Sequence, residues 1–386
     1  MRMHVDRRHE RVLALVQERG SLRVTDLAGE LGVSVVTVRR DVETLSGQGR
    51  LVRRHGAVLW PGAVADRRER EAGHAGGAPG RPAPVVGMVV PTVDRFFGDM
   101  VRGARETVEA QGGRLLLGLT SYQPEEDAAQ IGRMLEGGAN GLLLAPSWQE
   151  GLPSAAQQQR LRESAAPVVL VERWAPAGSP AAELDRVRTD RAHGAAMAVR
   201  HLADLGHRRI ALAVQESVHA GRIRDGFEGA VRSLGLTSVP VSPSEGHPAS
   251  TGTRRLEATL EHLADAVARD RVTAALVHSD ADAIALVARL RERGVRVPED
   301  LAVVAYDDEV ASLAEVPLTA VAPPKRAVGA MAAQLLLTRI AEDADREREA
   351  LPRQHLDLLP ELRVRASCGG GAGGTGGPGP VTRAAP

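Results

Sequence analysis

The sequence contains two pairs of neighbouring carboxylates, Asp280 with Asp282 and Asp307 with Asp308, that could serve as general acid and base. Each pair follows a predicted strand, where ligand binding or helix capping explains it equally well. A G-x-S-x-G elbow, an H-E-x-x-H motif and a Cys/His cluster with metal-ligand spacing are all missing from the sequence. We therefore expect binding rather than catalysis, with no metal and no cofactor.

Adjacent arginines supply a different chemistry, the binding of phosphate and of guanine edges. Arg39 and Arg40 lie in SVVTVRRDVETL, a predicted helix that Ser34 can cap. A helical wheel divides its residues into an inward set and an outward set: Val35, Val38, Val42 and Leu45 inward, and Val36, Arg39, Arg40 and Glu43 outward. An outward face of arginines that follows a tight turn suits the major groove of DNA.

Residues 1–60 form a small Arg-rich unit around this helix. Eleven arginines and seven carboxylates give the unit a net charge of +4, although the whole chain is formally neutral. Asp6 can cap a first helix that stops at Gly20, and a second short helix is predicted over residues 25–31. The segment GRLVRRHGAVLW predicts a two-stranded hairpin with arginines at its tip. Three helices followed by a hairpin are a winged helix-turn-helix pattern.

The stretches VSVVTVRRDVETL and RLVRRHGA carry a likeness to a known family. Residues 11–58 resemble the DNA-binding domain of the deoxyribonucleoside-repressor (DeoR) family. With Val36, which the wheel places on the same face, the predicted DNA contacts are Ser34, Thr37, Arg39 and Arg40 in the recognition helix, and Arg53 and Arg54 in the wing. A solvated helix or hairpin face is the alternative for each arginine, and Asp41 is expected to be a structural partner of a nearby arginine.

Residues 84–367 alternate strands with helices, which predicts an α/β fold. Repeated β-α-β units in two series predict two lobes facing a cleft, each with a doubly wound parallel sheet. Residues 61–83 are rich in Gly, Pro and charge and are expected to be a flexible linker. Residues 368–386 are expected to be a disordered, Gly-rich tail.

Aromatic residues gather at one predicted edge of these sheets. Six of the eight in the chain end a predicted strand or follow one: Phe96, Phe97, Tyr122, Trp148, Trp174 and Tyr306. Ligands of open α/β sheets bind at this edge. Rings beside carboxylates suit a sugar-like ligand, which stacks its C–H faces and donates its hydroxyls. For Phe97, Phe227 and Tyr306, burial in the core is the alternative.

Several separated motifs of this segment, among them GANGLLLAP, PVVLVERW and GVRVPEDLAVVAYDDEVASL, are similar to those of another family. They resemble the effector domain of the lactose/galactose-repressor (LacI/GalR) family, which is related to periplasmic sugar-binding proteins. The resemblance implies a small effector, typically a sugar or a nucleobase, held between two lobes. Together with the aromatic edge it predicts these effector contacts: Phe96, Phe97, Tyr122, Trp148, Glu172, Arg173, Arg222 or Arg224, Ser279, Asp280 and Asp307.

The sequence departs from that family in three ways. Ser279 stands where the family often has asparagine, and the arginine spacing before Gly226 leaves both Arg222 and Arg224 open as the contact. The family's own helix-turn-helix and hinge helix are absent, and so is the phosphosugar-sensing domain usual behind a DeoR-type reader. The chain therefore resembles a hybrid of two repressor families.

The composition indicates the cellular compartment in which such a protein works. The single cysteine, Cys368, excludes intramolecular disulfides, and the N-terminus lacks the apolar run of a secretory signal. No stretch approaches the ~18 apolar residues of a membrane span. We expect a cytoplasmic homodimer that binds operator DNA and a small effector, with repression of carbohydrate catabolism or transport genes as its role. A freestanding sugar-binding receptor is the alternative from another class, and the basic N-terminal unit disfavours it.

Overall fold

The computed structural model divides the chain into two compact units, Met1–Pro82 and Ala83–Pro386, called here the N-terminal unit and the large unit. The residues that the structure describes are 5–19, 21–47, 52–54, 57–59, 83–148, 153–162, 164, 166–215, 217–240, 252–343 and 351–370. The predicted linker therefore lies outside the described residues except for residue 83, and the predicted tail lies outside them except for residues 368–370.

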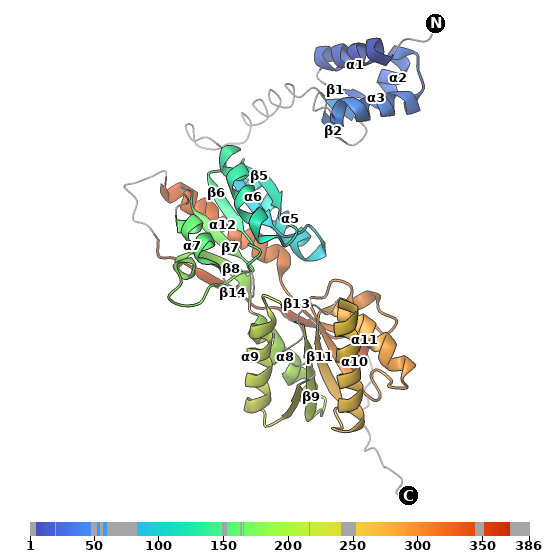
Figure 1. The fold of residues 1–386 in the computed structure, drawn as a ribbon, viewed down its shortest axis with the longest axis vertical. Helices are drawn as coiled ribbons and strands as arrows, with labels where there is room; N and C mark the ends of the chain where they lie inside the picture. Colours follow the sequence, from blue (N-terminus) through green and yellow to red (C-terminus); the bar gives the residue numbers. More distant parts are fainter. Residues whose placement is uncertain are drawn as a thin grey trace, which may run out of the picture. The chain divides into compact units, whose positions relative to one another are not determined.

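The N-terminal unit packs helices against a small antiparallel sheet, as predicted for a winged helix-turn-helix (Figure 1). Its described elements are α1 (Val5–Arg19), β1 (Ser21–Arg23), α2 (Val24–Leu31), α3 (Val35–Gly47), β2 (Val52–Arg54) and β3 (Ala57–Leu59). The predicted hairpin is confirmed as β2 and β3, and β1 adds a third strand on the other side of β3. Val38, Val42 and Leu45 of α3 are fully buried, as the wheel requires.

The large unit holds two lobes, each with one sheet. The first sheet is entirely parallel and has the order β14-β8-β7-β6-β4-β5. Its strands are β4 (Val85–Val90), β5 (Arg114–Leu119), β6 (Gly141–Leu144), β7 (Val168–Val171), β8 (Asp185–Thr189) and β14 (His355–Leu358). The helices of this lobe are α5 (Arg95–Ala110), α6 (Pro124–Glu136), α7 (Ala155–Arg162) and α12 (Lys325–Asp343). Buried runs such as VVLV in β7 fit a sheet covered on both faces.

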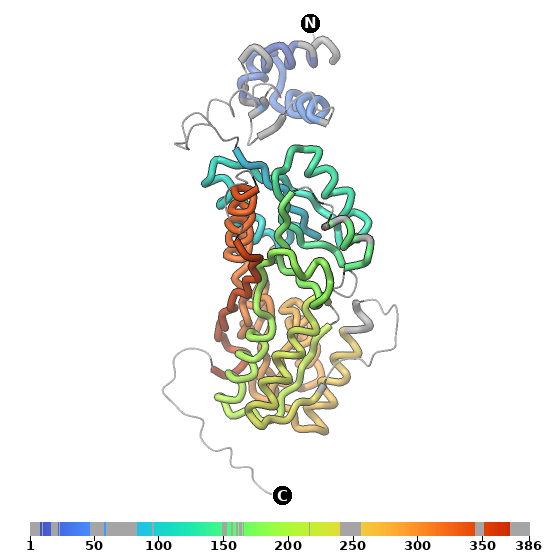
Figure 2. Tube along the Cα trace, turned by 90° about the vertical axis from the view of Figure 1, so that its left-hand side faces the viewer, coloured from blue at the N-terminus to red at the C-terminus, as the bar shows by residue number. Residues whose placement is uncertain are grey.

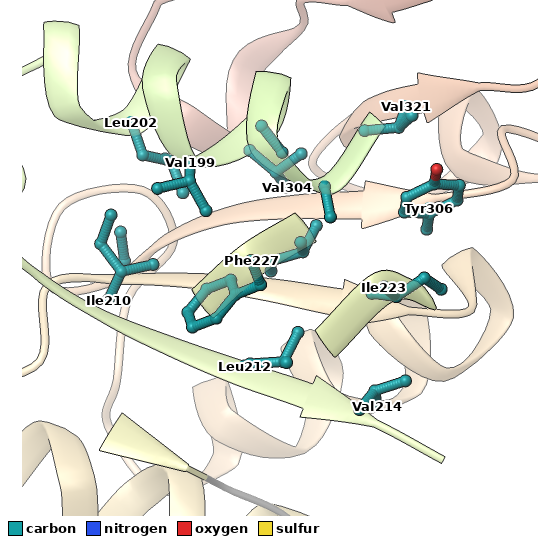
Figure 3. Packing of buried hydrophobic residues seen from close by; sticks show 14 of the residues in the cluster. Val199, Leu202, Ile210, Leu212, Val214, Ile223, Phe227, Val304, Tyr306 and Val321 are labelled. Carbon is teal, nitrogen blue, oxygen red and sulfur yellow. The ribbon is translucent and has the colours of Figure 1, made fainter. Parts of the chain in front are cut away.

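The second sheet has the order β10-β9-β11-β12-β13-β15 and is parallel except for β15. Its strands are β9 (Arg209–Val214), β10 (Thr237–Pro240), β11 (Ala274–His278), β12 (Ala302–Tyr306), β13 (Thr319–Ala322) and β15 (Glu361–Arg363). Its helices are α8 (Arg191–Asp204), α9 (Ala220–Ser233), α10 (Gly252–Ala268) and α11 (Asp280–Glu292). Figure 3 shows Phe227 and Tyr306 in the core between this sheet, α8 and α9, so for both the core alternative holds.

The chain passes between the lobes more than once. After building β9 to β13 of the second lobe it returns as α12, which packs on α5 and on β6, β7 and β8 of the first lobe. Figures 1 and 2 show α12, coloured orange-red, among the cyan and green elements of that lobe. β14 then joins the first sheet and β15 the second. Neither lobe is a continuous stretch of sequence.

Glycines allow α5 and α12 to touch backbone to backbone. A Cβ on Gly329 would lie 1.9 Å from the carbonyl oxygen of Met100, and one on Gly103 would lie 2.0 Å from that of Arg326. Both atoms belong to backbone that cannot step aside, so any larger residue would push the helices apart. The contact anchors α12 against the first lobe, with its first residue, Lys325, at the lobe's edge.

A buried ion pair ties α12 to the first sheet. Asp185, which is fully buried at the start of β8, accepts from Arg339 Nε at 2.8 Å and Nη2 at 2.9 Å. The backbone nitrogen of Gln354 and the side chain of Arg353 donate to the same carboxylate. Burial alone would raise the pKa of Asp185, but these donors, Arg339 first, lower it below the usual value. The carboxylate thus links β8, α12 and the segment that leads into β14.

Replacing Arg339 by leucine is predicted to lower the free energy of unfolding of the large unit by about 3–5 kcal/mol, because the Asp185 charge stays buried without its main partner. Since the folded-state pKa of Asp185 is lowered, this contribution is complete above the unfolded-state pKa of about 3.9 and fades as the pH falls below it. Urea unfolding at pH 7 and at acidic pH measures both effects. The control is Arg326→Ala, which removes an exposed pair with Glu106 and should cost about 0–1 kcal/mol. Equal losses in the two variants would contradict the prediction.

Candidate functional site

Helix α3 presents an exposed face at the predicted recognition positions. Ser34 caps the helix, because its Oγ accepts from the backbone nitrogen of Thr37 at 3.2 Å and lies 2.8 Å from the Thr37 hydroxyl. Arg39 and Arg40 are exposed, and Val36 is 75% exposed. An exposed valine beside two arginines has no role in the core of this unit. It has the composition of a surface that meets base edges, where guanidinium reads guanine and an apolar group meets the thymine methyl.

Asp41 of the same helix does not belong to this exposed face. It is buried and accepts from Arg8 Nε at 2.5 Å and Nη2 at 3.0 Å, and His9 Nε2 lies 3.1 Å away. Burial would raise the pKa of Asp41, but the hydrogen bonds from Arg8 and His9 lower it. Asp41 therefore fastens α1 to α3 as a structural partner of an arginine, as the sequence predicted, and fixes the angle at which α3 shows its outer face.

The predicted wing residues lie in strand β2. Arg53 pairs with Val58 and Arg54 with Ala57 across the hairpin. The side chains of both arginines, and the hairpin tip at residues 55–56, are outside the described part of the chain. Their role in DNA contact remains a prediction.

The carboxyl ends of the two sheets of the large unit meet at a buried cluster of charged side chains. Arg191, the first residue of α8, donates from Nη1 to Asp307 Oδ1 at 2.5 Å, and its Nη2 lies 3.5 Å from Glu172 Oε2. His278 Nε2 lies 3.3 Å from Asp307 Oδ2. Lys325 Nζ donates to the backbone carbonyl of Asp307 at 2.6 Å. We call Glu172, Arg191, His278, Asp307 and Lys325 the central cluster; it takes residues from both lobes.

Mutual pairing outweighs burial for Asp307 and Arg191. Burial raises the pKa of Asp307, but Arg191 and His278 outweigh it and hold that pKa far below its usual value. Burial lowers the pKa of Arg191, but Asp307 and Glu172 raise it above its usual value. Arg173 donates to two backbone carbonyls, those of Pro146 and Glu172, and burial lowers its pKa to about 10. Asp307 and Arg191 therefore form a buried ion pair at neutral pH.

Aromatic rings flank the central cluster. The Arg191 Cζ lies 5.1 Å from the centre of the Phe96 ring and 5.2 Å from that of Tyr306, and Lys325 Nζ lies 5.3 Å from the Phe96 ring. Phe96 and Phe97 pack edge to face with centroids 5.2 Å apart. Rings over cations are attracted by their quadrupole. Of the predicted effector contacts, the structure thus brings Phe96, Glu172 and Asp307 together, with Phe97 and Arg173 next to them.

Two of the predicted effector contacts, Asp280 and Ser279, make hydrogen bonds within the protein. One oxygen of Asp280, Oδ2, accepts from the backbone nitrogens of Glu309, Val310 and Ala311 at 2.5, 2.6 and 3.0 Å. Ser279 caps α11 in a reciprocal arrangement with Asp282. A carboxylate that binds three amides is committed to shaping the loop after β12, the loop that carries Asp307 into the central cluster.

Other predicted contacts lie away from the central cluster. Trp148 is buried against Asp127 and Leu161 on the face of the first sheet that α6 and α7 cover, whereas Phe97 belongs to the core on the other face. Tyr122 is 58% exposed. On α9, the Arg222 Cζ lies 4.8 Å from the centre of the Trp174 ring and its Nη1 3.9 Å from Asp225. Arg224 lies half-buried on the same helix.

The sequence interpretation did not single out Arg191, His278 or Lys325. Each lies at or near the carboxyl end of a strand: Arg191 and Asp190 follow β8, His278 ends β11, and Lys325 begins the helix after β13. Arg191 and Lys325 were missed because β8 and β13 were not predicted. Lys325 is also the only lysine in the chain, a signal that is visible in the sequence.

Two searches of the described residues have negative results. No group of three or more His, Cys, Asp or Glu side chains is arranged to hold a metal ion. No helix combines the length and apolarity needed to cross a membrane.

Comparison with known proteins matches both units. The model of the DeoR-like helix-turn-helix domain matches residues 8–62, and that of the periplasmic binding protein-like domain matches residues 199–368. The arabinose metabolism transcriptional repressor of Geobacillus stearothermophilus is 28% identical over 350 residues, 89% of this chain and 89% of that protein. The transcriptional regulator DegA of Bacillus subtilis (strain 168) is 27% identical over 353 residues, 89% and 97% of the two chains.

Two solved structures are also similar to this chain. The transcriptional regulator CelR in complex with cellobiose is 27% identical, with a TM-score of 0.59 over 88% of this chain and 98% of that one. The transcription regulator GntR of Chromobacterium violaceum is 25% identical, with a TM-score of 0.56 over 74% and 100%. Both parts of the expected hybrid are therefore present. The chain is a transcriptional regulator that joins a DeoR-like helix-turn-helix domain to a periplasmic-binding-protein-like domain.

Proposed function

We propose that this regulator is a repressor of carbohydrate catabolism or transport genes whose operator affinity is controlled by a sugar-like effector. The observation that carries the effector part is the central cluster, where carboxylates and the ring of Phe96 meet at the carboxyl ends of both sheets. The arabinose repressor and the CelR–cellobiose complex among its relatives support a sugar as the class of effector. The protein would act in the cytoplasm, where its operator lies.

The DNA contacts are proposed to come from α3 and the hairpin. Arg39 and Arg40 would read base edges in the major groove, with Ser34, Val36 and Thr37 at the same surface, and Arg53 and Arg54 would hold the DNA backbone or the minor groove. The exposure of Arg39, Arg40 and Val36 on a helix whose other face is buried supports this assignment.

Control of DNA binding would come from the lobes. An effector bound at the central cluster contacts groups of both lobes, so it favours one arrangement of the lobes over another. It shifts operator affinity only by its difference in affinity for the two arrangements. The groups proposed to contact the effector are Phe96, Glu172, Arg173 and Asp307. Ser279 and Asp280 would act indirectly, by fixing α11 and the loop after β12. Trp148 and Arg222 stay weaker candidates because their described contacts are with groups outside the central cluster. Tyr122 and Arg224 stay candidates as well, and the charge of Arg173 acts on Tyr122.

We propose a homodimer as the working form. Strand β5 is the edge of the first sheet, and its residues Leu117 and Leu119 are 41% and 40% exposed. An edge strand with exposed leucines is a surface that proteins usually cover. A dimer would also place two helices α3 on the two halves of an operator.

Arg40→Ala is predicted to cost roughly 1–3 kcal/mol of discrimination between operator and random DNA, because a guanidinium that reads a base edge is lost. Fluorescence anisotropy on DNA from upstream of the gene and on random DNA, at one fixed salt concentration, measures the two affinities. The matched control is Arg102→Ala, an exposed arginine of the large unit. An equal loss on both DNAs would mean that Arg40 contacts phosphate rather than bases.

Asp307→Ala is predicted to abolish release of operator DNA by the effector while leaving operator affinity without effector unchanged, since Asp307 lies in the other unit from α3. Asp280→Ala is predicted to lower the melting temperature because three backbone donors lose their acceptor, at about 1–3 kcal/mol or more. Asp307→Ala should lower it too, because Arg191 then stays buried without its main partner. The dose response of operator release in anisotropy against a sugar panel, not the melting temperature, therefore tests the effector contact. An Asp307→Ala protein with an unchanged dose response would remove Asp307 from the site.

A further inference from the structure

Arg191 occupies the centre of the proposed effector site with its own guanidinium. The side chain is 3% exposed, although arginine is among the residues least often buried. It lies between the rings of Phe96 and Tyr306, at 5.1 and 5.2 Å, and between the carboxylates of Asp307 and Glu172. Two ring faces and two carboxylates around one position are what a protein offers to a bound cation. Here the cation belongs to the chain itself.

The two carboxylates have no oxygen left without a partner. Glu172 Oε1 accepts from the backbone nitrogen and the hydroxyl of Thr189, at 2.8 and 2.6 Å, and Oε2 faces Arg191. Asp307 Oδ1 accepts from Arg191, and Oδ2 faces His278. Arg191 already contacts Oδ1 of Asp307 and Oε2 of Glu172. A sugar hydroxyl that is to donate to either oxygen must therefore compete with Arg191.

The hydrogen bonding of the Arg191 guanidinium is incomplete, so a ligand can displace this group. Its Nε is buried and has no acceptor within the described part of the chain, and the Nη2 contact with Glu172 is long, at 3.5 Å. A buried donor without an acceptor is destabilising, so this guanidinium is held less firmly than a fully bonded one. Arg339 differs from Arg191 in this respect, because all three of its side-chain nitrogens, Nε, Nη1 and Nη2, donate hydrogen bonds.

We propose that Arg191 is an internal occupant of the effector site, and that an effector binds by displacing its guanidinium from Asp307 and Glu172. The proposal rests on the proposed function, whose site it shares. An incoming ligand must then replace what the guanidinium supplies: donors for two carboxylates and a flat surface for the rings of Phe96 and Tyr306. A neutral polyhydroxylated ring meets both needs.

The occupant can be tested without knowing the effector, by replacing it with a small guanidinium compound. In Arg191→Ala, methylguanidinium chloride at millimolar concentration should fill the vacated position and raise the melting temperature, because a ligand that binds only the folded state stabilises it. The matched control is Arg188→Ala, which removes an arginine from β8 that grips Asp357 at 2.8 and 2.7 Å, with no ring contact among the described interactions. A rise confined to Arg191→Ala is expected. Equal shifts in wild type, control and variant would overturn the proposal.

The second test uses calorimetric titration of L-arabinose, cellobiose, glucose and glucose 6-phosphate into wild type and Arg191→Gln, which keeps much of the side-chain volume and serves if the alanine variant fails to fold. If Arg191 competes with the ligand, the glutamine variant should bind a neutral sugar about tenfold tighter or more, because the ligand no longer has to displace an occupant. Weaker binding in the variant would mean that Arg191 holds the ligand, which overturns the proposal and leaves the proposed function standing. No sugar binding in either protein, with rescue by methylguanidinium intact, would instead reject the sugar effector and retain the internal occupant.

Discussion

The buried contact between Arg191 and Asp307 sets the arrangement of the groups around it. Two charges taken out of water are tolerable only when each is paired and hydrogen-bonded. That requirement places Glu172 against Arg191, and His278 and Lys325 against Asp307. It also accounts for backbone strain, since Glu172 and Asp307 both adopt positive φ angles, 52° and 90°, which non-glycine residues rarely do. Backbone strain that surrounding contacts hold in place is found more often at functional sites than in the rest of a fold.

Sequence patterns predicted the fold where an element buries one periodic stripe. Helix α3 is such a case, with Val38, Val42 and Leu45 on one side, and the alternation of strands and helices predicted for the large unit is confirmed. The patterns did not find α12, because that helix is packed against α5 on one side and the first sheet on another and shows no single stripe. β8, β13, β14 and β15 were missed as well. The runs of β8 and β14, DRVRT and HLDL, alternate with charged residues, and β13 is the short run TAVA.

The site was predicted in part, for a comparable reason. The rule that ligands bind at the carboxyl ends of strands selected the edge of the sheets where Phe96, Glu172 and Asp307 lie together, and their role in effector binding stays a prediction. It says nothing about which way a side chain turns once the strand has ended. Asp280 turned toward the amides of the following loop, and Trp148 turned under α6 and α7. Those choices depend on unsatisfied backbone donors and on core volume, which appear only when distant segments meet.

The late return of α12 has a consequence for how the chain is made. Five residues of α12, Val328, Ala332, Ala333, Leu335 and Leu336, belong to the core of the first lobe. Synthesis from the N-terminus therefore delivers all of β4 to β8 before the helix that covers them exists. The apolar face that α12 covers is therefore made before β9 to β13 of the second lobe, and its cover is made after them. β14 and β15, one strand for each sheet, follow α12 along the chain. Domains usually fold in the order in which they are made; here neither lobe is complete until nearly all of the large unit has been made.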